Sequence, residues 1–166
     1  AVALAMHTSG RPVRLAHNRE EEFTGSTVTR HPVDVEITSG IDREGKIVAR
    51  RVSLVFDTGA YADVGPRVCR NAGFSAAGPY GIPHVSVDAR CVYTHTVPCG
   101  ALRGFGIPQT TWAVESHMDM IARELGIDPL RFRLINAVEE GSESATGQVL
   151  TSVGLKDTLT AAAEAI

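Results

Sequence analysis

The chain contains a long run of alternating apolar and polar residues, from Val85 to Val97. This run limits the folds that the chain can adopt. The alternate side chains that begin with Val85 are mostly apolar, and those between them are mostly polar. Successive side chains of a β-strand point to opposite faces of a sheet, so this period of two predicts a strand with one buried face. The strand is expected to end at Pro98, because proline has no N–H to donate to a strand ladder.

Two earlier segments predict a hairpin. Residues 33–38 alternate between aliphatic and polar side chains, and residues 47–56 place valine, leucine and phenylalanine on one face. The segment between them, GIDREGK at residues 40–46, is polar and bounded by glycines. A polar, glycine-containing stretch between two alternating runs is typical of a hairpin connection.

Helices are predicted between and after the strands. A short helix is expected over residues 66–78, and a longer one over residues 110–125 with Gly126 as its C-terminal cap. Asp128 and Pro129 predict the start of a further helix, as its N-cap and first helical residue. Strands mixed with helices in this way predict an α+β fold of two layers, with helices packed on a mixed β-sheet.

The two ends of the sequence also read as apolar helices. Residues 1–6 are expected to be the last turns of a buried helix, residues 12–17 a short extended segment, and residues 154–166 another apolar helix. A length of 166 residues suits one compact unit, so we expect a single domain over residues 1–166. Apolar helices at both ends indicate a piece of a longer protein.

The charge balance and hydropathy argue against two classes of partner. Lys and Arg number 16 and Asp and Glu 19, which gives a net charge of −3. Neutralising the phosphates of a nucleic acid requires clustered basic residues, so no nucleic-acid partner is expected. No apolar run approaches the roughly 20 residues of a membrane-spanning helix, so no membrane partner is expected either.

The cysteines and histidines do not predict a metal site. Cys69, Cys91 and Cys99 are not spaced as CxxC pairs, and reduced, buried thiols in a cytoplasmic protein are expected. The six histidines show no HxH, HxxxH or HExxH spacing. We therefore expect no side-chain metal ligand from this chain.

One short motif, Asp57-Thr58-Gly59, follows an apolar run and is compatible with the catalytic loop of an aspartic protease. That chemistry needs two carboxylates that share a proton, one from each half or subunit. Residues 90–166 hold no convincing copy of the apolar strand that supports such a loop. A turn at a strand end is the favoured interpretation, and an aspartic protease subunit is the alternative.

The segment with the strongest chemical signal is GALRGFGIPQ, at residues 100–109, between the predicted long strand and a helix. Gly104 and Gly106 allow a close backbone approach to a ligand, and the helix N-terminus favours an anion. Arg103 adds a positive charge, and Phe105 supplies a ring that could stack on a flat substrate. Two interpretations remain open, a ligand-binding loop and a tight turn with Phe105 tucked into the core.

Several ordered motifs resemble the large subunit of the molybdenum hydroxylases, the xanthine dehydrogenase/aldehyde oxidase family. The resemblance covers essentially the whole sequence. The motifs that carry it are RPVR at 11–14, DTGAY at 57–61, GPYGIP at 78–83, RGFGIPQ at 103–109 and LGIDP at 125–129. Ile107 stands where many members of the family have glycine.

The resemblance implies the fold of the family's molybdenum cofactor-binding domain and a set of binding residues. Arg103, Gly104 and Gly106 would contact the molybdopterin cofactor. The backbone amide of Arg103 would lie near the molybdenum, which takes no side-chain ligand from this chain. Phe105 would stack on the substrate, and Arg70 would line the substrate pocket.

The resemblance also implies a reaction, the oxidation of a heterocycle or an aldehyde with oxygen from water. The catalytic glutamate of the family lies farther along the subunit, so no catalytic residue is expected here and residues 1–166 alone are expected to be inactive. Electrons would leave through iron–sulfur clusters and FAD in partner subunits or domains of a hetero-oligomer. The alternative from another class is a non-catalytic piece that only contacts neighbouring subunits.

Overall fold

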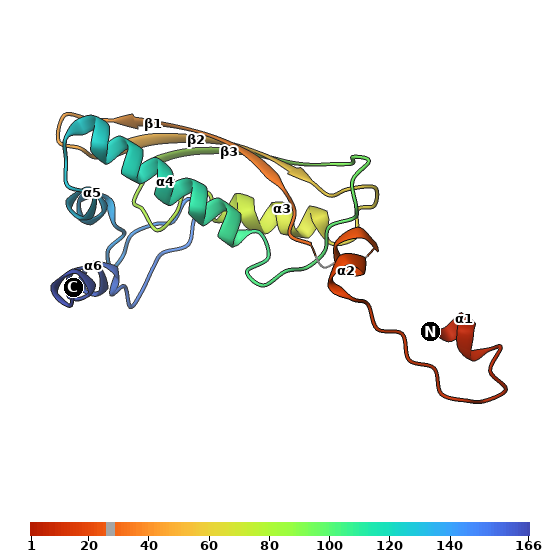
Figure 1. The fold of residues 1–166 in the computed structure, drawn as a ribbon. Coiled ribbons are helices and arrows are strands. Elements are labelled where there is room, and N and C mark those ends of the chain that lie inside the picture. The colour runs from red at the N-terminus through yellow and green to blue at the C-terminus, as the bar shows by residue number, and fades with distance from the viewer. Residues whose placement is uncertain (26–28) are drawn as a thin grey trace.

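The computed structural model describes residues 1–25 and 29–166. Its elements, in chain order, are α1 (Val2–Ala5), α2 (Arg19–Gly25), β1 (Val33–Ile41), β2 (Ile47–Asp57), α3 (Gly65–Phe74), β3 (His84–Val92), α4 (Ile107–Leu125), α5 (Pro129–Asn136) and α6 (Leu155–Glu164). In Figure 1, α3, α4 and α5 all lie on the same side of the sheet. The predicted two-layer α+β fold is therefore confirmed.

The sheet has three strands in the order β1-β2-β3 and is mixed. β1 and β2 form the predicted antiparallel hairpin, in which Val33 pairs with Phe56. β2 and β3 are parallel, and Val52 pairs with Val87. Parallel neighbours need a crossover connection, and here α3 supplies it. The central strand β2 therefore places its alternate residues against the helices, and Val52 and Phe56 are fully buried.

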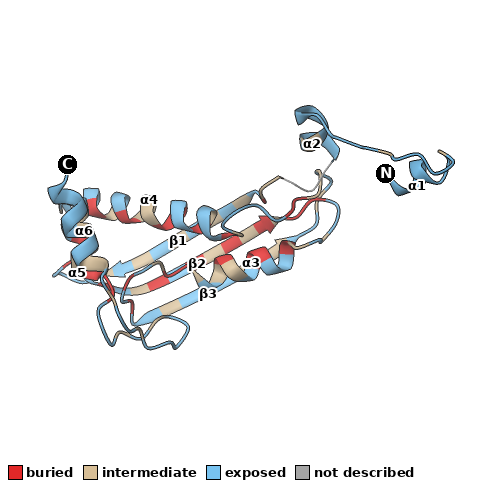
Figure 2. Ribbon diagram, turned by 90° about the horizontal axis from the view of Figure 1, so that it is seen from below, coloured by how far each residue is buried: buried red, intermediate tan, exposed pale blue. Residues whose placement is uncertain are grey.

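The core lies between the sheet and the helices, in two clusters. One cluster joins the start of β2 to α4 and α5, and its members include Ile47, Tyr80, Val114, Met118 and Phe132. The other joins the rest of β2 to α3, and its members include Val52, Leu54, Phe56, Val68 and Ala72. Figure 2 shows the buried residues on β2 and on the inward faces of α3 and α4. This second cluster also supports the loop before α4, through Phe105.

The prediction for β3 was too long, because the strand ends at Val92 and not at Val97. β2 ends at Asp57, so the chain beyond Val92 no longer has a straight neighbour to pair with. Instead the amide of Thr94 donates to the carbonyl of Gly59, in the turn that follows β2. β3 is also an edge strand and is only half covered, with Val87 37% exposed.

The N-terminal predictions were also wrong in part. Residues 1–6 contain only the four-residue helix α1, which has no buried residue, so it does not form the end of a buried helix within this chain. Residues 12–17 form no strand ladder. The first 18 residues extend away from the body of the molecule (Figure 1), so no sheet edge or core face of this chain is available to them.

Most helix boundaries agree with the sequence prediction. Gly126 caps α4 in the left-handed conformation, and the side chain of Asp128 accepts from the amide of Arg131 at the start of α5. α3 ends earlier than predicted, at Phe74, where the hydroxyl of Ser75 donates to the carbonyl of Ala72. The predicted C-terminal helix is present as α6, without a buried residue.

Within the described residues, no helix combines the length and the apolar character needed to cross a membrane. The three cysteines are free thiols, as expected. Cys69 and Cys99 are buried, whereas Cys91 is half-buried.

Candidate functional site

The loop before α4 takes an unusual backbone conformation. Gly104, Phe105 and Gly106 have φ values of 93°, 48° and 96°, all in the left-handed region. A Cβ atom at Gly104 would lie 2.4 Å from Cγ of Pro108, and one at Gly106 would lie 2.5 Å from the carbonyl oxygen of Val68. Both glycines are therefore required, by their φ angles and by the close approach of neighbouring atoms.

The peptide carbonyls of this loop all have donors inside the protein. Two of these donors are side chains from distant parts of the sequence, and the others come from the loop and α4. The side-chain donors are Arg30 Nη2, to the carbonyl of Arg103 (2.9 Å), and Asn71 Nδ2, to the carbonyl of Phe105 (2.8 Å). The other donors are Phe105 N, to the carbonyl of Leu102 (2.9 Å), Ile107 N, to the carbonyl of Gly104 (3.0 Å), and Thr110 Oγ1, to the carbonyl of Gly106 (3.3 Å).

Three amides of the same loop are not used in this way. The N–H groups of Arg103, Gly104 and Gly106 have no hydrogen-bond partner among residues 1–25 and 29–166. All peptide bonds described are trans, so each amide points opposite to the carbonyl of the residue before it. The amides of Arg103, Gly104 and Gly106 therefore point away from the donors that hold the carbonyls before them; Arg103 and Gly104 are exposed, and Gly106 is buried. A group of such amides favours a negatively charged ligand.

The side chains of the loop complete this arrangement. Arg103 is exposed, so its positive charge lies at the surface beside the amides. Phe105 is half-buried and packs against the core cluster that contains Phe56. Its ring is thus fixed against the core, and the residue as a whole is not fully buried.

Arg70 lies on a different flank of α3 from the loop. It borders a cavity of about 520 Å³ between α3 and β3, together with Phe74 and Ala89. The loop instead contacts Asn71 and the backbone of Val68. One step along a helix is a rotation of about 100°. The structure therefore brings Asn71, rather than Arg70, next to Phe105.

Arg30 and Asn71 are the residues that sequence reasoning missed. Both bind backbone carbonyls of the loop, and a backbone partner leaves no pattern in the sequence. Arg30 comes from the segment before β1 and Asn71 from the middle of α3. Only the fold brings them to the same loop, so the available signal was the glycine-rich motif and not its supports.

The Asp57-Thr58-Gly59 motif forms the predicted strand-end turn. Oδ1 of Asp57 accepts from the amide of Gly59 at 2.7 Å and from the hydroxyl of Thr94 at 2.6 Å, and Oδ2 accepts from Thr96 at 3.2 Å. Burial raises the pKa of Asp57, but these hydrogen bonds outweigh it and hold the pKa below the usual value. A carboxylate committed to its own turn does not support the alternative of an aspartic protease.

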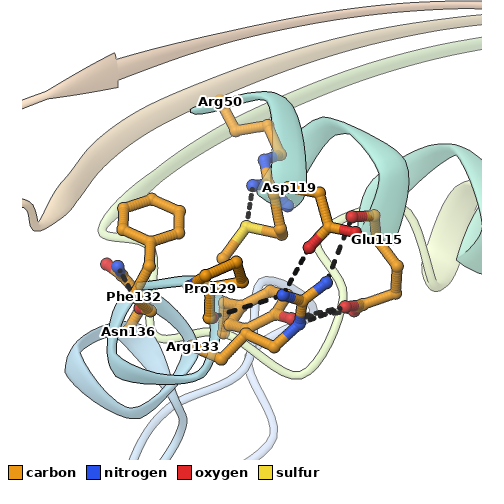
Figure 3. A network of polar contacts seen from close by, with 9 residues as sticks. Arg50, Glu115, Asp119, Pro129, Phe132, Arg133 and Asn136 are labelled. Atoms are coloured by element: carbon orange, nitrogen blue, oxygen red, sulfur yellow. Dashed lines mark hydrogen bonds and ion pairs between the residues drawn. The ribbon is translucent and has the colours of Figure 1, made fainter. Parts of the chain in front are cut away.

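A second polar network joins α4 to α5 (Figure 3). The guanidinium of Arg133 contacts Glu115 at 2.8 Å and Asp119 at 2.7 Å, and the hydroxyl of Tyr80 donates to Glu115 at 2.8 Å. Burial and the hydrogen bond to Glu115 raise the pKa of Tyr80. Arg50, which is buried, donates to the carbonyl of Ala77. Every polar group here has a protein partner, so the network is structural.

Within the described residues, no cluster of His, Cys, Asp and Glu has the arrangement needed to bind a metal ion.

The comparisons with known proteins agree on one family. Residues 1–137 match the family described as "Molybdopterin cofactor-binding domain". The chain is 43% identical over 163 residues to the nicotinate dehydrogenase large molybdopterin subunit of Eubacterium barkeri. This match covers 98% of this chain and 38% of that subunit. The chain is 35% identical over 160 residues to the xanthine dehydrogenase molybdenum-binding subunit of Escherichia coli, covering 96% of this chain and 21% of that protein.

A solved structure gives the same result at the level of the fold. The aldehyde oxidoreductase from Desulfovibrio gigas superimposes with a TM-score of 0.88 at 33% sequence identity, over 99% of this chain and 18% of that chain. This chain thus spans well under half the length of the proteins it matches. From its sequence, its fold and the match over residues 1–137, the chain belongs to the family of molybdopterin cofactor-binding domains.

Proposed function

We propose that residues 1–166 are one domain of a larger molybdenum-containing oxidoreductase subunit, and that residues 102–106 hold its molybdopterin cofactor. One observation carries this proposal. Every carbonyl of the loop is engaged inside the protein, while the amides of Arg103, Gly104 and Gly106 have no partner among the described residues. A backbone so oriented provides donors for a negatively charged group.

The residues of the loop fit such a cofactor. Gly104 and Gly106 permit the left-handed backbone that leaves these amides without a partner among the described residues, and exposed Arg103 adds a positive charge at the same place. The amide of Arg103 would lie beside the molybdenum, which the pterin itself binds. When bound, the cofactor supplies the redox chemistry, and the protein supplies binding and orientation.

The substrate is proposed to be an electron-poor heterocycle or an aldehyde, oxidised with oxygen from water. The relatives are named for nicotinate, xanthine and aldehydes, which fall in these two classes. The ring of half-buried Phe105 would contact a flat substrate. Arg70 is proposed as a substrate contact in the cavity between α3 and β3, which residues 102–106 do not line.

Other parts of the assembly would complete the reaction. We expect iron–sulfur and FAD subunits or domains to carry the electrons away, within a cytoplasmic hetero-oligomer. The catalytic glutamate would also come from outside residues 1–166. The chain would therefore contribute cofactor and substrate contacts but no catalytic residue.

The proposal is tested by measuring molybdenum and pterin in the full-length protein, purified after co-expression with its genomic neighbours. We expect equimolar molybdenum and pterin in the wild type and a large loss of both in Gly104→Ala, because a Cβ there meets Pro108. Gly141→Ala, where a Cβ atom would project into open space, is the matched control and should keep both. A wild-type protein without molybdenum and pterin would refute the proposal.

A further inference from the structure

We propose that Arg30 and Asn71 are positioning residues, which aim the amides of Gly104 and Gly106 toward the cofactor by holding the carbonyls of Arg103 and Phe105. The inference rests on the proposed function of the loop. It concerns how the loop is held in its binding conformation.

Arg30 connects three parts of the chain around the start of α4. Its Nη2 donates to the carbonyl of Arg103 at 2.9 Å, and its Nη1 donates to Oε1 of Gln109 at 3.2 Å. Gln109 in turn donates from Nε2 to the carbonyl of His31 at 3.1 Å. The planar guanidinium thus fixes the loop relative to the first turn of α4 and to the segment before β1.

Asn71 holds the loop from the other direction, on α3. Its Nδ2 donates to the carbonyl of Phe105 at 2.8 Å. α3 and the loop are in close contact here, because Gly106 leaves room for the carbonyl oxygen of Val68. Two donors from separate elements therefore restrain carbonyls that lie two residues apart.

These restraints are needed because glycine permits the loop conformation without enforcing it. A peptide plane next to a glycine can rotate at low cost, since glycine occupies positive and negative φ about equally. Rotation of the 103–104 or 105–106 peptide would turn a carbonyl toward the cofactor in place of an amide. The donors on Arg30 and Asn71 favour the orientation in which the amides of Gly104 and Gly106 point away from these two side chains.

The backbone of Phe105 gives a second reason why these restraints are needed. Its φ of 48° is unfavourable for a residue with a side chain, and such conformations persist only where the surroundings impose them. The hydrogen bond from Asn71 acts on the carbonyl of this residue, and the core packs against its ring. Loss of the donor would release the strained residue between the two glycines.

The test uses the full-length protein purified with its partner subunits and three variants. Arg30→Met and Asn71→Asp remove the donors, and Arg67→Met, at an exposed position of α3, is the control. Hydrogen exchange is followed at the amides of Phe105 and Ile107, whose bonds lie within the loop. We expect exchange about tenfold faster in both donor variants and unchanged in the control. Molybdenum content should fall in the same two variants.

The exchange rates and the molybdenum content together decide whether Arg30 and Asn71 position the loop. Unchanged exchange at Phe105 and Ile107 in both donor variants would overturn the positioning role, whatever the molybdenum content. Faster exchange with full molybdenum content would show that the restraint does not serve the cofactor, and would also overturn it. Wild-type protein without molybdenum would refute the proposed function, while the exchange data would still report on the restraint. Arg30→Lys, which keeps the charge and an N–H donor group, should retain part of the protection, and it replaces Arg30→Met in the test if that variant does not fold.

Discussion

Gly106 illustrates, at the scale of one residue, how the loop depends on the absence of a side chain. Its φ is 96°, and a Cβ atom would lie 2.5 Å from the carbonyl oxygen of Val68. Gly141 has a similar φ of 79°, but no atom lies within 4 Å of its Cβ position. The two positions therefore separate backbone strain from steric overlap.

Gly106→Ala is expected to lower the free energy of unfolding by about 3 kcal/mol, because strain and overpacking add. Gly141→Ala should cost about 1 kcal/mol, from strain alone. Urea denaturation followed by circular dichroism measures both. Equal losses in the two variants would contradict the close packing of the loop on α3.

His31 gives a prediction for the dependence of stability on pH. Its side chain is buried, and its Nε2 has no hydrogen-bond partner within the described structure. Burial lowers the pKa of His31, against a smaller opposite effect of the carboxylates of Asp63 and Asp57. On acidification the unfolded chain therefore binds a proton before the folded chain does, and stability falls as the pH drops below about 6.5. The loss levels off once the pH is below the folded-state pKa.

His31→Gln cannot take up that proton, so its free energy of unfolding should depend less on pH than that of the wild type between about pH 7 and about pH 5. The measurement is urea denaturation at both values. His84→Gln, at an exposed position, is the control and should keep the wild-type dependence. If the free energy of unfolding of His31→Gln depended on pH as strongly as that of the wild type, His31 would be excluded as the source of this dependence.

The sequence singled out Gly104 and Gly106 as residues that allow a close backbone approach to a ligand, but it did not predict which residues hold the loop. The structure adds that both glycines have positive φ. Arg30 and Asn71 bind carbonyl oxygens, which every residue has, so their partners could not be recognised before the fold was known. The sequence also could not show which way Arg70 points, because that depends on which face of α3 packs against the loop.

Between elements, the contact of α4 with α5 relies on the ion pairs of Arg133. The side chain of Arg133 is only 17% exposed, and its partners are Glu115 and Asp119 on α4. Removing a positive charge from such a largely buried position leaves the carboxylates that it pairs with without an opposite charge. The exposed pair of Arg90 and Asp88 on β3 has the same chemistry without the burial.

Arg133→Met keeps much of the apolar length of the side chain and removes its charge. We expect it to lower the free energy of unfolding by about 2 kcal/mol, because Glu115 and Asp119 lose the positive charge that pairs with them, while Glu115 keeps its hydrogen bond from Tyr80. Arg90→Met should have no measurable effect, since its pair is exposed to solvent. Thermal and urea denaturation of the two variants provide the comparison, and equal effects would contradict the structural role of the network.

The elements show which sequence signals carry across to the structure. The hairpin β1–β2 and the caps of α4 and α5 depend on local patterns, and they were predicted. The end of β3 depends on its neighbour, because an edge strand can extend only as far as β2 offers hydrogen bonds. Alternation alone continues to Val97 and gave no sign of this.

For the whole molecule, one face of the sheet is covered by helices and the other carries polar residues. The opposite face includes exposed side chains of Asp34, Glu36 and Arg51. The chain also spans only 38% of the length of its relative from Eubacterium barkeri. The proposed catalytic glutamate and electron carriers would therefore lie in other parts of the assembly.

Residues 1–166 produced alone are thus expected to show no turnover. The measurement adds nicotinate, xanthine or an aldehyde, with an artificial electron acceptor, to the purified chain. The matched control is the full-length protein with its partner subunits, which should turn over one of the three. Turnover by residues 1–166 alone would contradict the division of labour proposed for the assembly.

The cofactor site is tested most directly by locating the molybdenum in a crystal of the assembled enzyme, by anomalous scattering at its absorption edge. We expect the cofactor to lie against residues 102–106, with its oxygen atoms within hydrogen-bond distance of the amides of Arg103, Gly104 and Gly106. Molybdenum in the crystal with this loop turned away from the cofactor would contradict this expectation.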